Sequence, residues 1–386
     1  MSFSLLRQSL TRPISSSSRG SFGLLRFLSV KASAITFANT GIPKDVVKLV
    51  SYELNGPGPD EILVKTLASP INPADINQLE GVYPSMPAFT TELTPEQPSA
   101  IGGNEGLFEI VEVGSNIKNF KAGDWAIPRL PNFGTWRSHA LVTPGDLTPI
   151  NRDGITHTQA ATISVNPCTA HQMLTQFVDL KKGDWFIQNG GNSGVGRAAI
   201  QLGRIWGLNS ISVVRSRDNL DELIAELKDL GATQVITEEQ LNSKAFKPTI
   251  KEWTQGKPIK LGFNCVGGKS ATGVARQLGH GGKLVTYGGM SKQPVILPTS
   301  LFIFKDVSAH GYWLSAWTKK DPEGKGKAVE EMLNHIRSGQ FKDVPVSPNV
   351  WSNASSDEAK LEVFKQALDN ATKGFAGKKQ VLEFTD

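Results

Sequence analysis

Trp185-Phe-Ile-Gln-Asn-Gly-Gly-Asn-Ser-Gly-Val-Gly-Arg197 is the stretch that decides the fold. The apolar run at its start predicts a buried strand, and residues 197–206 carry apolar side chains at helical spacing. A glycine-rich turn joins the two. A strand, a glycine turn and a helix in this order are typical of a dinucleotide-binding site, although a simple loop of the same composition is the alternative.

Three glycines in this turn have the spacing G-x-x-G-x-G. We expect Gly191 to allow the tight turn and Gly194 to let the backbone approach a pyrophosphate. We expect Gly196 to let the helix pack closely on the strand. The free N–H groups at the start of the helix would then face the phosphates.

Alternating strands and helices follow the glycine turn, and this pattern predicts a doubly wound parallel sheet. The expected strands are 210–214, 234–236, 261–265, 283–287 and 307–314, and the expected helices are 219–230, one from residue 269, and 327–337.

The part of the chain before the glycine turn lacks this alternation of strands and helices. Short β-type segments with Gly and Pro turns predict a small barrel-like domain, in the segments 48–67, 101–114, 121–128 and 133–142. A helical pattern runs from Thr158 to Phe177.

The tail that ends at Asp386 is too short for a domain of its own, so we expect it to pack on the first domain. The fold class is therefore α/β with two domains, as 386 residues suggest.

Basic residues are concentrated at the N-terminus. No acidic residue precedes Asp45, whereas six basic residues do: Arg7, Arg12, Arg19, Arg26, Lys31 and Lys44. Residues 1–30 are rich in Arg, Ser and Leu, which predicts a mitochondrial transit peptide rather than an ordinary tail or a secretory signal. Acidic and basic residues nearly balance in the remainder, and no apolar run is long enough to span a bilayer. We therefore expect no nucleic-acid partner and no membrane insertion.

Metal ligation is not expected. The chain has 2 cysteines, Cys168 and Cys265, and 6 scattered histidines without an H-x-x-x-H pair.

The segment after the second expected strand predicts which cofactor binds. An NAD-dependent enzyme would place Asp or Glu there for the ribose hydroxyls. This chain has Arg215-Ser216-Arg217, whose two guanidinium groups suit a 2′-phosphate. We therefore expect NADPH. The alternative is that the two arginines are simply solvated. The negative charge of the nearby Asp218 slightly weakens the inference.

Tyr83 is a candidate proton donor, although a tyrosine in this setting is more often a surface or packing residue, and the family resemblance given below is what favours the catalytic role. Asn72 is a good helix N-cap, Pro73 suits the first helical position and Gly81 can end that helix in a left-handed conformation. Tyr83 and Pro84 follow on a short, stiff loop. A tyrosine stays protonated at physiological pH and can donate a proton. Asp75, Ser164 and His139 are weaker candidates.

Several longer motifs resemble a known family. They are Asn104-Glu-Gly-Leu-Phe108, Asn132-Phe-Gly-Thr-Trp-Arg137, Ala161-Thr-Ile-Ser-Val-Asn-Pro167, Gln188-Asn189, Asn192-Ser-Gly-Val-Gly196, Asn264-Cys-Val-Gly-Gly-Lys-Ser270, Thr286-Tyr-Gly-Gly-Met290 and Lys379-Gln380. With them the chain, from about residue 40 to its end, resembles the mitochondrial trans-2-enoyl-thioester (enoyl-CoA/ACP) reductases. These are zinc-free, quinone-oxidoreductase-like members of the medium-chain dehydrogenase/reductase superfamily.

The resemblance implies a GroES-like catalytic domain of residues 31–163 and 317–386, and a Rossmann domain of residues 164–316 that binds NADPH. It implies a homodimer in the mitochondrial matrix. It also implies that the cofactor contacts Asn166, Asn192, Ser193, Gly194, Val195, Arg215, Ser216, Arg217, Tyr287, Gly288, Gly289, Met290, Tyr312, Trp313, Leu314 and Lys379.

Some positions depart from the family or leave alternatives open. Ser216 replaces the commoner Asp between the two arginines, and His171 stands where a Tyr is expected. Asn104 replaces a histidine of the zinc-dependent relatives, so a structural role is expected for the adjacent Glu105. Trp136 and Trp313 are candidates both for substrate contact and for the core. Asn166 is a candidate both for a helix cap and for a cofactor contact.

The function expected from the resemblance is the NADPH-dependent reduction of trans-2-enoyl thioesters, on acyl-carrier protein or CoA, to saturated acyl thioesters in mitochondrial fatty-acid synthesis. An NADPH quinone oxidoreductase on the same fold is the alternative enzyme. A binding role, such as an RNA-binding or transcription-partner protein on a reductase fold, is the alternative from another class.

Overall fold

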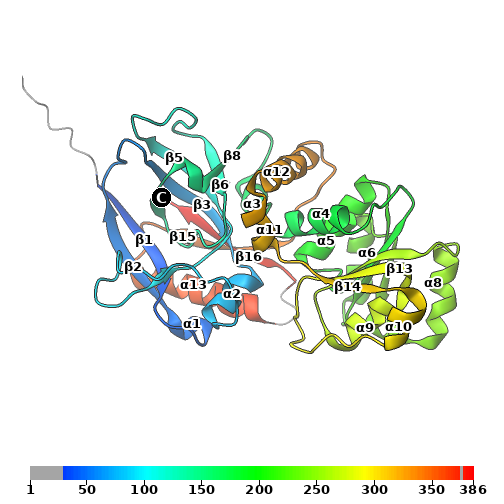
Figure 1. Cartoon of the computed structure of the whole chain (residues 1–386). Helices are drawn as coiled ribbons and strands as arrows, with labels where there is room; N and C mark the ends of the chain where they lie inside the picture. The colour runs from blue at the N-terminus through cyan, green and yellow to red at the C-terminus, as the bar shows by residue number, and fades with distance from the viewer. Residues whose placement is uncertain (1–28, 374–376) are drawn as a thin grey trace, which may run out of the picture.

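The computed structural model describes residues 29–373 and 377–386, which form two lobes joined along one side (Figure 1). The predicted transit peptide lies outside these residues, except for its last two positions. Val30, the last position of the predicted leader, begins the first described strand.

The first lobe is β-rich. Among the described residues it holds a sheet in the order β15-β16-β3-β5-β6-β8, with β7 paired to β3, and a smaller sheet in the order β2-β1-β4. Its strands are β1 Val30–Phe37, β2 Val47–Leu54, β3 Ile62–Pro70, β4 Ala100–Ile101, β5 Leu107–Val113, β6 Trp125–Pro128, β7 His139–Val142, β8 Leu147–Ile150, β15 Val346–Ser352 and β16 Lys379–Thr385. This is a GroES-like β domain, as expected.

The second lobe is built on a parallel sheet with the strand order β11-β10-β9-β12-β13-β14. This order reverses between β9 and β12, as in a Rossmann domain. Along β9, Phe186 faces one apolar cluster whereas Trp185 and Ile187 face another, so the sheet is buried on both faces. Its strands are β9 Trp185–Gln188, β10 Asn209–Val214, β11 Gln234–Thr237, β12 Ile259–Asn264, β13 Leu278–Thr286 and β14 Ser308–Gly311.

The helices are distributed over both lobes (Figure 1). In chain order they are α1 Pro43–Val46, α2 Pro73–Leu79, α3 His157–Ala161, α4 Asn166–Gln176, α5 Gly194–Ile205, α6 Leu220–Asp229, α7 Glu238–Asn242, α8 Lys247–Trp253, α9 Gly268–Gln277, α10 Thr299–Lys305, α11 Leu314–Lys320, α12 Pro322–Arg337 and α13 Asp357–Thr372. No helix in the described ranges has the length and apolar character that a membrane span requires.

The C-terminal tail returns to the first lobe, as expected. Strand β16 pairs with β3, α13 packs against β16, and both lie in the left lobe of Figure 1. By contrast, α12 contacts α4, and its Met332 shares an apolar cluster with Met173 of α4 and Leu107 of β5. The cluster spans both lobes, so the exact domain boundaries remain a prediction.

Two sequence expectations need correction. The helix predicted from Thr158 to Phe177 is interrupted at residues 162–165, because the N–H of Val165 donates to the buried carboxylate of Glu105 at 2.8 Å. The strand predicted to reach Leu314 ends at Gly311, and Leu314 begins α11. Tyr312 and Trp313 therefore lie in a connection that follows a strand end.

Candidate active site

The glycine turn after β9 lies at the carboxyl edge of the parallel sheet, where doubly wound folds bind their ligands. Gly190 has φ +60°, so the left-handed residue is Gly190 and not the expected Gly191. Gly191 is required for another reason: a Cβ there would lie 2.8 Å from the Cβ of Ser212 on β10.

Helix α5 begins within this turn. Ser193 is its N-cap, and its Oγ accepts a hydrogen bond from the N–H of Gly196 at 3.0 Å. A Cβ on Gly196 would lie 2.5 Å from the carbonyl oxygen of Gly190, so this glycine lets the helix pack on the backbone of the turn and not on the strand as expected. Asn192, Ser193 and Gly194 remain partly exposed, so the helix N-terminus is open to an anion.

Asn166 lies directly beside this turn. A Cβ on Gly194 would be 2.5 Å from the Nδ2 atom of Asn166, so the glycine allows the two elements to approach. Asn166 is the first residue of α4, and it makes no capping hydrogen bond. Its position at the glycine turn therefore favours the cofactor contact over the cap, and the contact itself stays a prediction.

Arg197 shapes the turn in a way that the sequence analysis missed. Its guanidinium group binds both carboxylate oxygens of Glu226, at 2.7 and 2.9 Å, and its Nε donates to the carbonyl oxygen of Asn192 at 3.0 Å. The ion pair lowers the pKa of Glu226. Arg197 thus binds a carbonyl oxygen of the turn. It does not use the N–H groups at the start of α5, which are the groups that phosphates need.

Arg215, Ser216 and Arg217 follow β10, next to the glycine turn. Burial and the positive charges of Arg215 and Arg197 lower the pKa of Arg217. Because these guanidinium groups repel one another, an anion that binds among them is stabilised. Ser216 donates to Glu239 at 2.8 Å.

The other predicted cofactor residues lie on two connections of the same sheet edge. Tyr312 is buried and Tyr287 is partly buried, and burial raises the pKa of both phenols. Met290 is 65% exposed and Trp313 is 40% exposed. Met290 and Trp313 are therefore the most exposed of these side chains, and contact of the two tyrosines with a cofactor stays a prediction.

Tyr83 and Trp313 meet across the two lobes. The indole Nε1–H of Trp313 donates to the Tyr83 hydroxyl oxygen at 2.7 Å, and the rings are edge to face with centroids 6.0 Å apart. An indole N–H is a donor only, so the Tyr83 oxygen accepts and its own proton is free to point elsewhere. Lys292, which follows Met290, lies 3.8 Å from Glu80 at the end of α2 and joins the same two regions.

Trp136, the other tryptophan considered for substrate contact, lies in the core. It is fully buried, stacks edge to face on Phe364, and lies against Gly102 and Gly103. His171 contacts Glu331 at 3.0 Å and the ring of Trp206. Neither residue reaches the Tyr83 hydroxyl through these contacts.

A buried polar cluster lies beneath α2. Lys379 donates to Asn72 at 2.5 Å and lies 3.8 Å from Glu105, which also accepts from Asn72 at 2.9 Å. Burial raises the pKa of Asp75 to about 6 and lowers the pKa of Lys379. Glu105 therefore has a structural role, as expected, whereas contact of Lys379 with the cofactor stays a prediction.

No group of three His, Cys, Asp or Glu side chains suited to a metal occurs in residues 29–373 and 377–386. Asn104 instead directs its amide N–H groups to Asp75 and Gln78, at 2.7 and 2.8 Å. An N–H group that donates is not a metal ligand.

These residues fit a phosphorylated dinucleotide. The open N-terminus of α5 provides donors for a pyrophosphate, and the Arg pair beyond β10 provides cations for a further phosphate. The glycine turn lies at the strand-order reversal between β9 and β12, where Asn189 and Asn264 are hydrogen-bonded at 2.8 Å, and the Arg pair follows the neighbouring strand β10.

Comparisons with known proteins agree with this geometry. Residues 58–145 match the alcohol dehydrogenase GroES-like domain, and residues 194–333 match the family described as zinc-binding dehydrogenase. A curated relative, the mitochondrial enoyl-[acyl-carrier-protein] reductase of Yarrowia lipolytica, is 52% identical over 366 residues, which are 95% of each chain.

Solved structures are also similar. A complex described as Etr1p with NADP and crotonyl-CoA has a TM-score of 0.87 at 46% identity and covers 92% of this chain and 100% of its own. A mitochondrial 2-enoyl thioester reductase Etr1p/Etr2p heterodimer from Candida tropicalis has a TM-score of 0.87 at 47% identity, with the same coverage.

Proposed function

This chain belongs to the mitochondrial enoyl-thioester reductases of the medium-chain dehydrogenase/reductase superfamily, and from that premise we propose how its own residues carry out the reaction. It is an NADPH-dependent enzyme that reduces trans-2-enoyl thioesters to saturated acyl thioesters. The observation that carries the proposal is the contact between Tyr83 of the first lobe and Trp313, which follows β14 of the parallel sheet.

We assign the phosphates to the N-terminus of α5, with Asn192, Ser193 and Gly194, and the 2′-phosphate to Arg215 and Arg217. We propose the remaining cofactor contacts, as the resemblance implies, for Asn166, Ser216, Val195, Tyr287, Gly288, Gly289, Met290, Tyr312, Trp313, Leu314 and Lys379. NADPH supplies, when bound, a hydride for the β-carbon of the substrate.

Tyr83 is the proposed proton donor. Addition at the β-carbon leaves negative charge on the thioester oxygen and the α-carbon, and the α-carbon must then take up a proton. The Tyr83 hydroxyl has its proton free, because its oxygen accepts from Trp313. The same indole N–H stabilises the charge that the phenol oxygen acquires as the proton leaves.

The test of the function is a comparison of substrates with one enzyme preparation. We expect rapid NADPH oxidation with enoyl thioesters and slow oxidation with simple quinones, because only the thioester uses a positioned proton donor. The same assay with enoyl groups on acyl-carrier protein and on CoA tests our proposal that both carriers are accepted.

We propose that the enzyme is a homodimer formed through the edge of the parallel sheet. In the described part of the chain, β14 is one of the two outer strands of that sheet, β11 being the other, and α10 precedes β14 by two residues. An apolar patch of Val295, Ile296, Phe302, Ile303 and Phe304 is exposed there, with Phe304 76% exposed. Exposed patches and free strand edges are typical of subunit interfaces, and two copies can pair them symmetrically.

Ile303→Glu combined with Phe304→Glu should convert the dimer to monomers. The interface would otherwise bury four carboxylates, two from each subunit, without a counter-charge. Light scattering after size-exclusion chromatography measures the mass. Val350→Glu is the control, since Val350 is an exposed apolar residue on β15, in the other lobe, and should leave the dimer intact. A dimeric double variant would contradict the assignment of the interface.

The enzyme is mitochondrial. We propose the matrix as its compartment, because the acid-free N-terminal segment is typical of import into the matrix. Fractionation of mitochondria that contain the tagged full-length chain tests this, and recovery from the outer compartments with Met1 intact would contradict it.

A further inference from the structure

The loop that carries Tyr83 is attached on both sides of the tyrosine. On the N-terminal side, the N–H groups of Val82 and Tyr83 both donate to the carbonyl oxygen of Asn77, at 3.0 and 3.2 Å. Gly81, with φ +78°, turns the chain out of α2. These local bonds fix only the N-terminal end of the loop. Other contacts fix its C-terminal end.

Two side-chain amides fix the C-terminal side. Gln78 donates to the carbonyl oxygen of Ser85 at 2.6 Å. Asn132 donates to the Oγ of Ser85 at 2.9 Å and to the carbonyl oxygen of Met86 at 3.0 Å. Gln78 and Ser85 are buried, so these bonds are shielded from water. The two residues that follow Pro84 are therefore clamped to the first lobe.

The clamp is itself part of a saturated network. The second N–H of Gln78 donates to the Oδ1 of Asn132 at 2.8 Å, and Asn104 donates to the Oε1 of Gln78 at 2.8 Å. The backbone N–H of Asn132 donates to the Oδ1 of Asn104 at 2.8 Å. Each amide oxygen and each amide N–H of these three residues thus has a partner. A fully satisfied network of this kind defines one arrangement of its members.

Asn132 adopts a conformation that the network helps to hold. Its φ is +66°, in the left-handed region that few residues other than glycine adopt. Residues in such conformations persist where the surroundings determine them, and they cluster at functional sites.

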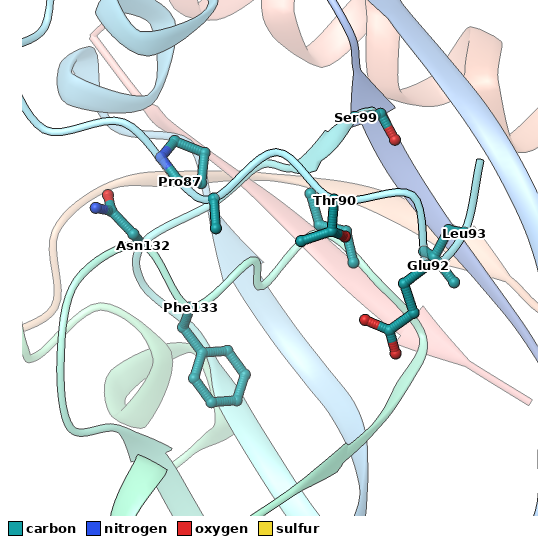
Figure 2. Close-up of a pocket in the computed structure, with 9 residues that line it drawn as sticks. Pro87, Thr90, Glu92, Leu93, Ser99, Asn132 and Phe133 are labelled. Carbon is teal, nitrogen blue, oxygen red and sulfur yellow. The ribbon is translucent and has the colours of Figure 1, made fainter. Parts of the chain in front are cut away.

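The segment beyond Met86 borders a cavity on one side. The cavity has a volume of about 170 Å³. Figure 2 shows Asn132, Pro87 and Phe133 at one end of it and Glu92 and Leu93 at the other. The chain after Met86 therefore has open space on one side, while Met86 itself packs against the apolar cluster of Ile35 and Phe37. The hydrogen bonds of Asn132 and Gln78 add to this packing at Ser85 and Met86.

We propose that Asn132 and Gln78 are positioning residues for proton transfer: by clamping Ser85 and Met86 they hold the Tyr83 hydroxyl in place against Trp313. Neither residue touches the substrate in this account, and both act through Tyr83. The inference rests on the proposed role of Tyr83 as the proton donor.

A double-mutant cycle tests the proposal. Asn132→Gly removes the amide and keeps a residue suited to positive φ. It should lower kcat about 10- to 100-fold in the wild-type background, because small displacements of a catalytic group cost this much. It should increase the solvent deuterium isotope effect on kcat, while the KM for the enoyl thioester and for NADPH changes less than about twofold. In the Tyr83→Phe background it should change kcat less than about twofold, because the group that it positions is absent.

Gln255→Gly is the matched control, since Gln255 also has positive φ (+52°) but lies after α8 in the second lobe. If Asn132→Gly does not fold, as judged by circular dichroism and NADPH binding, the same cycle is measured with Asn132→Asp, which keeps the shape and removes the N–H donors. An equal loss of kcat in both backgrounds, or an unchanged kcat in the wild-type background, would overturn the proposal. Wild-type turnover of Tyr83→Phe alone would instead refute the role of Tyr83.

Discussion

Tyr83→Phe should lower kcat for enoyl-thioester reduction by about 10²–10⁴, the usual range for loss of a general acid. The substitution removes one hydroxyl and keeps the ring that lies edge to face on Trp313. The dissociation constant of NADPH should change little, because the glycine turn and the Arg pair are untouched. Steady-state kinetics with crotonyl-CoA gives kcat, and fluorescence titration gives the dissociation constant.

Tyr52→Phe provides the control for the loss of a phenol hydroxyl. Tyr52 donates to the carbonyl oxygen of His139 at 2.7 Å, within the first lobe. Its loss should cost about 1 kcal/mol in the free energy of unfolding and leave kcat unchanged. A Tyr83→Phe enzyme with full turnover would refute the assignment, and a parallel loss of NADPH affinity would indicate a structural role for Tyr83.

Replacing Arg215 and Arg217 together by alanine should raise the KM for NADPH far more than the KM for NADH. A charge-assisted hydrogen bond contributes about 1.5–3 kcal/mol, so the ratio of the two KM values should change at least tenfold. Removal of the pair also relieves the repulsion that contributes to the lowered pKa of Arg217. Initial rates with each cofactor at saturating enoyl thioester provide the measurement.

Arg276→Ala, in the last turn of α9, controls for the loss of a surface arginine. It should leave the preference for NADPH unchanged. Equal changes of KM for the two cofactors in the double variant would show that Arg215 and Arg217 do not bind the 2′-phosphate.

Local patterns predicted the parallel sheet well. Apolar runs such as Trp185–Ile187, followed by glycine and a helical pattern, define strand and helix within a few residues of the observed bounds. The position of Tyr83 after a capped helix was also readable, since Asn72, Pro73 and Gly81 act over short distances.

Features that depend on distant residues were not readable from the sequence. The break between α3 and α4 comes from Glu105, 60 positions before Val165. The hydrogen bond between Trp313 and Tyr83 joins residues 230 positions apart, and Asn132 reaches Ser85 across 47. Trp136 has no local signal that would separate a core tryptophan from one at the site. The left-handed Gly190 was missed because several adjacent glycines could each have made the turn.

The most direct test of the account is the reaction of one purified preparation with NADPH and either crotonyl-CoA or a simple quinone. The account predicts that NADPH oxidation with crotonyl-CoA yields an equal amount of butyryl-CoA, that Tyr83→Phe slows this reaction strongly, and that the slower quinone reaction is insensitive to the same substitution. Faster oxidation with the quinone, or oxidation with crotonyl-CoA that yields no butyryl-CoA, would contradict it.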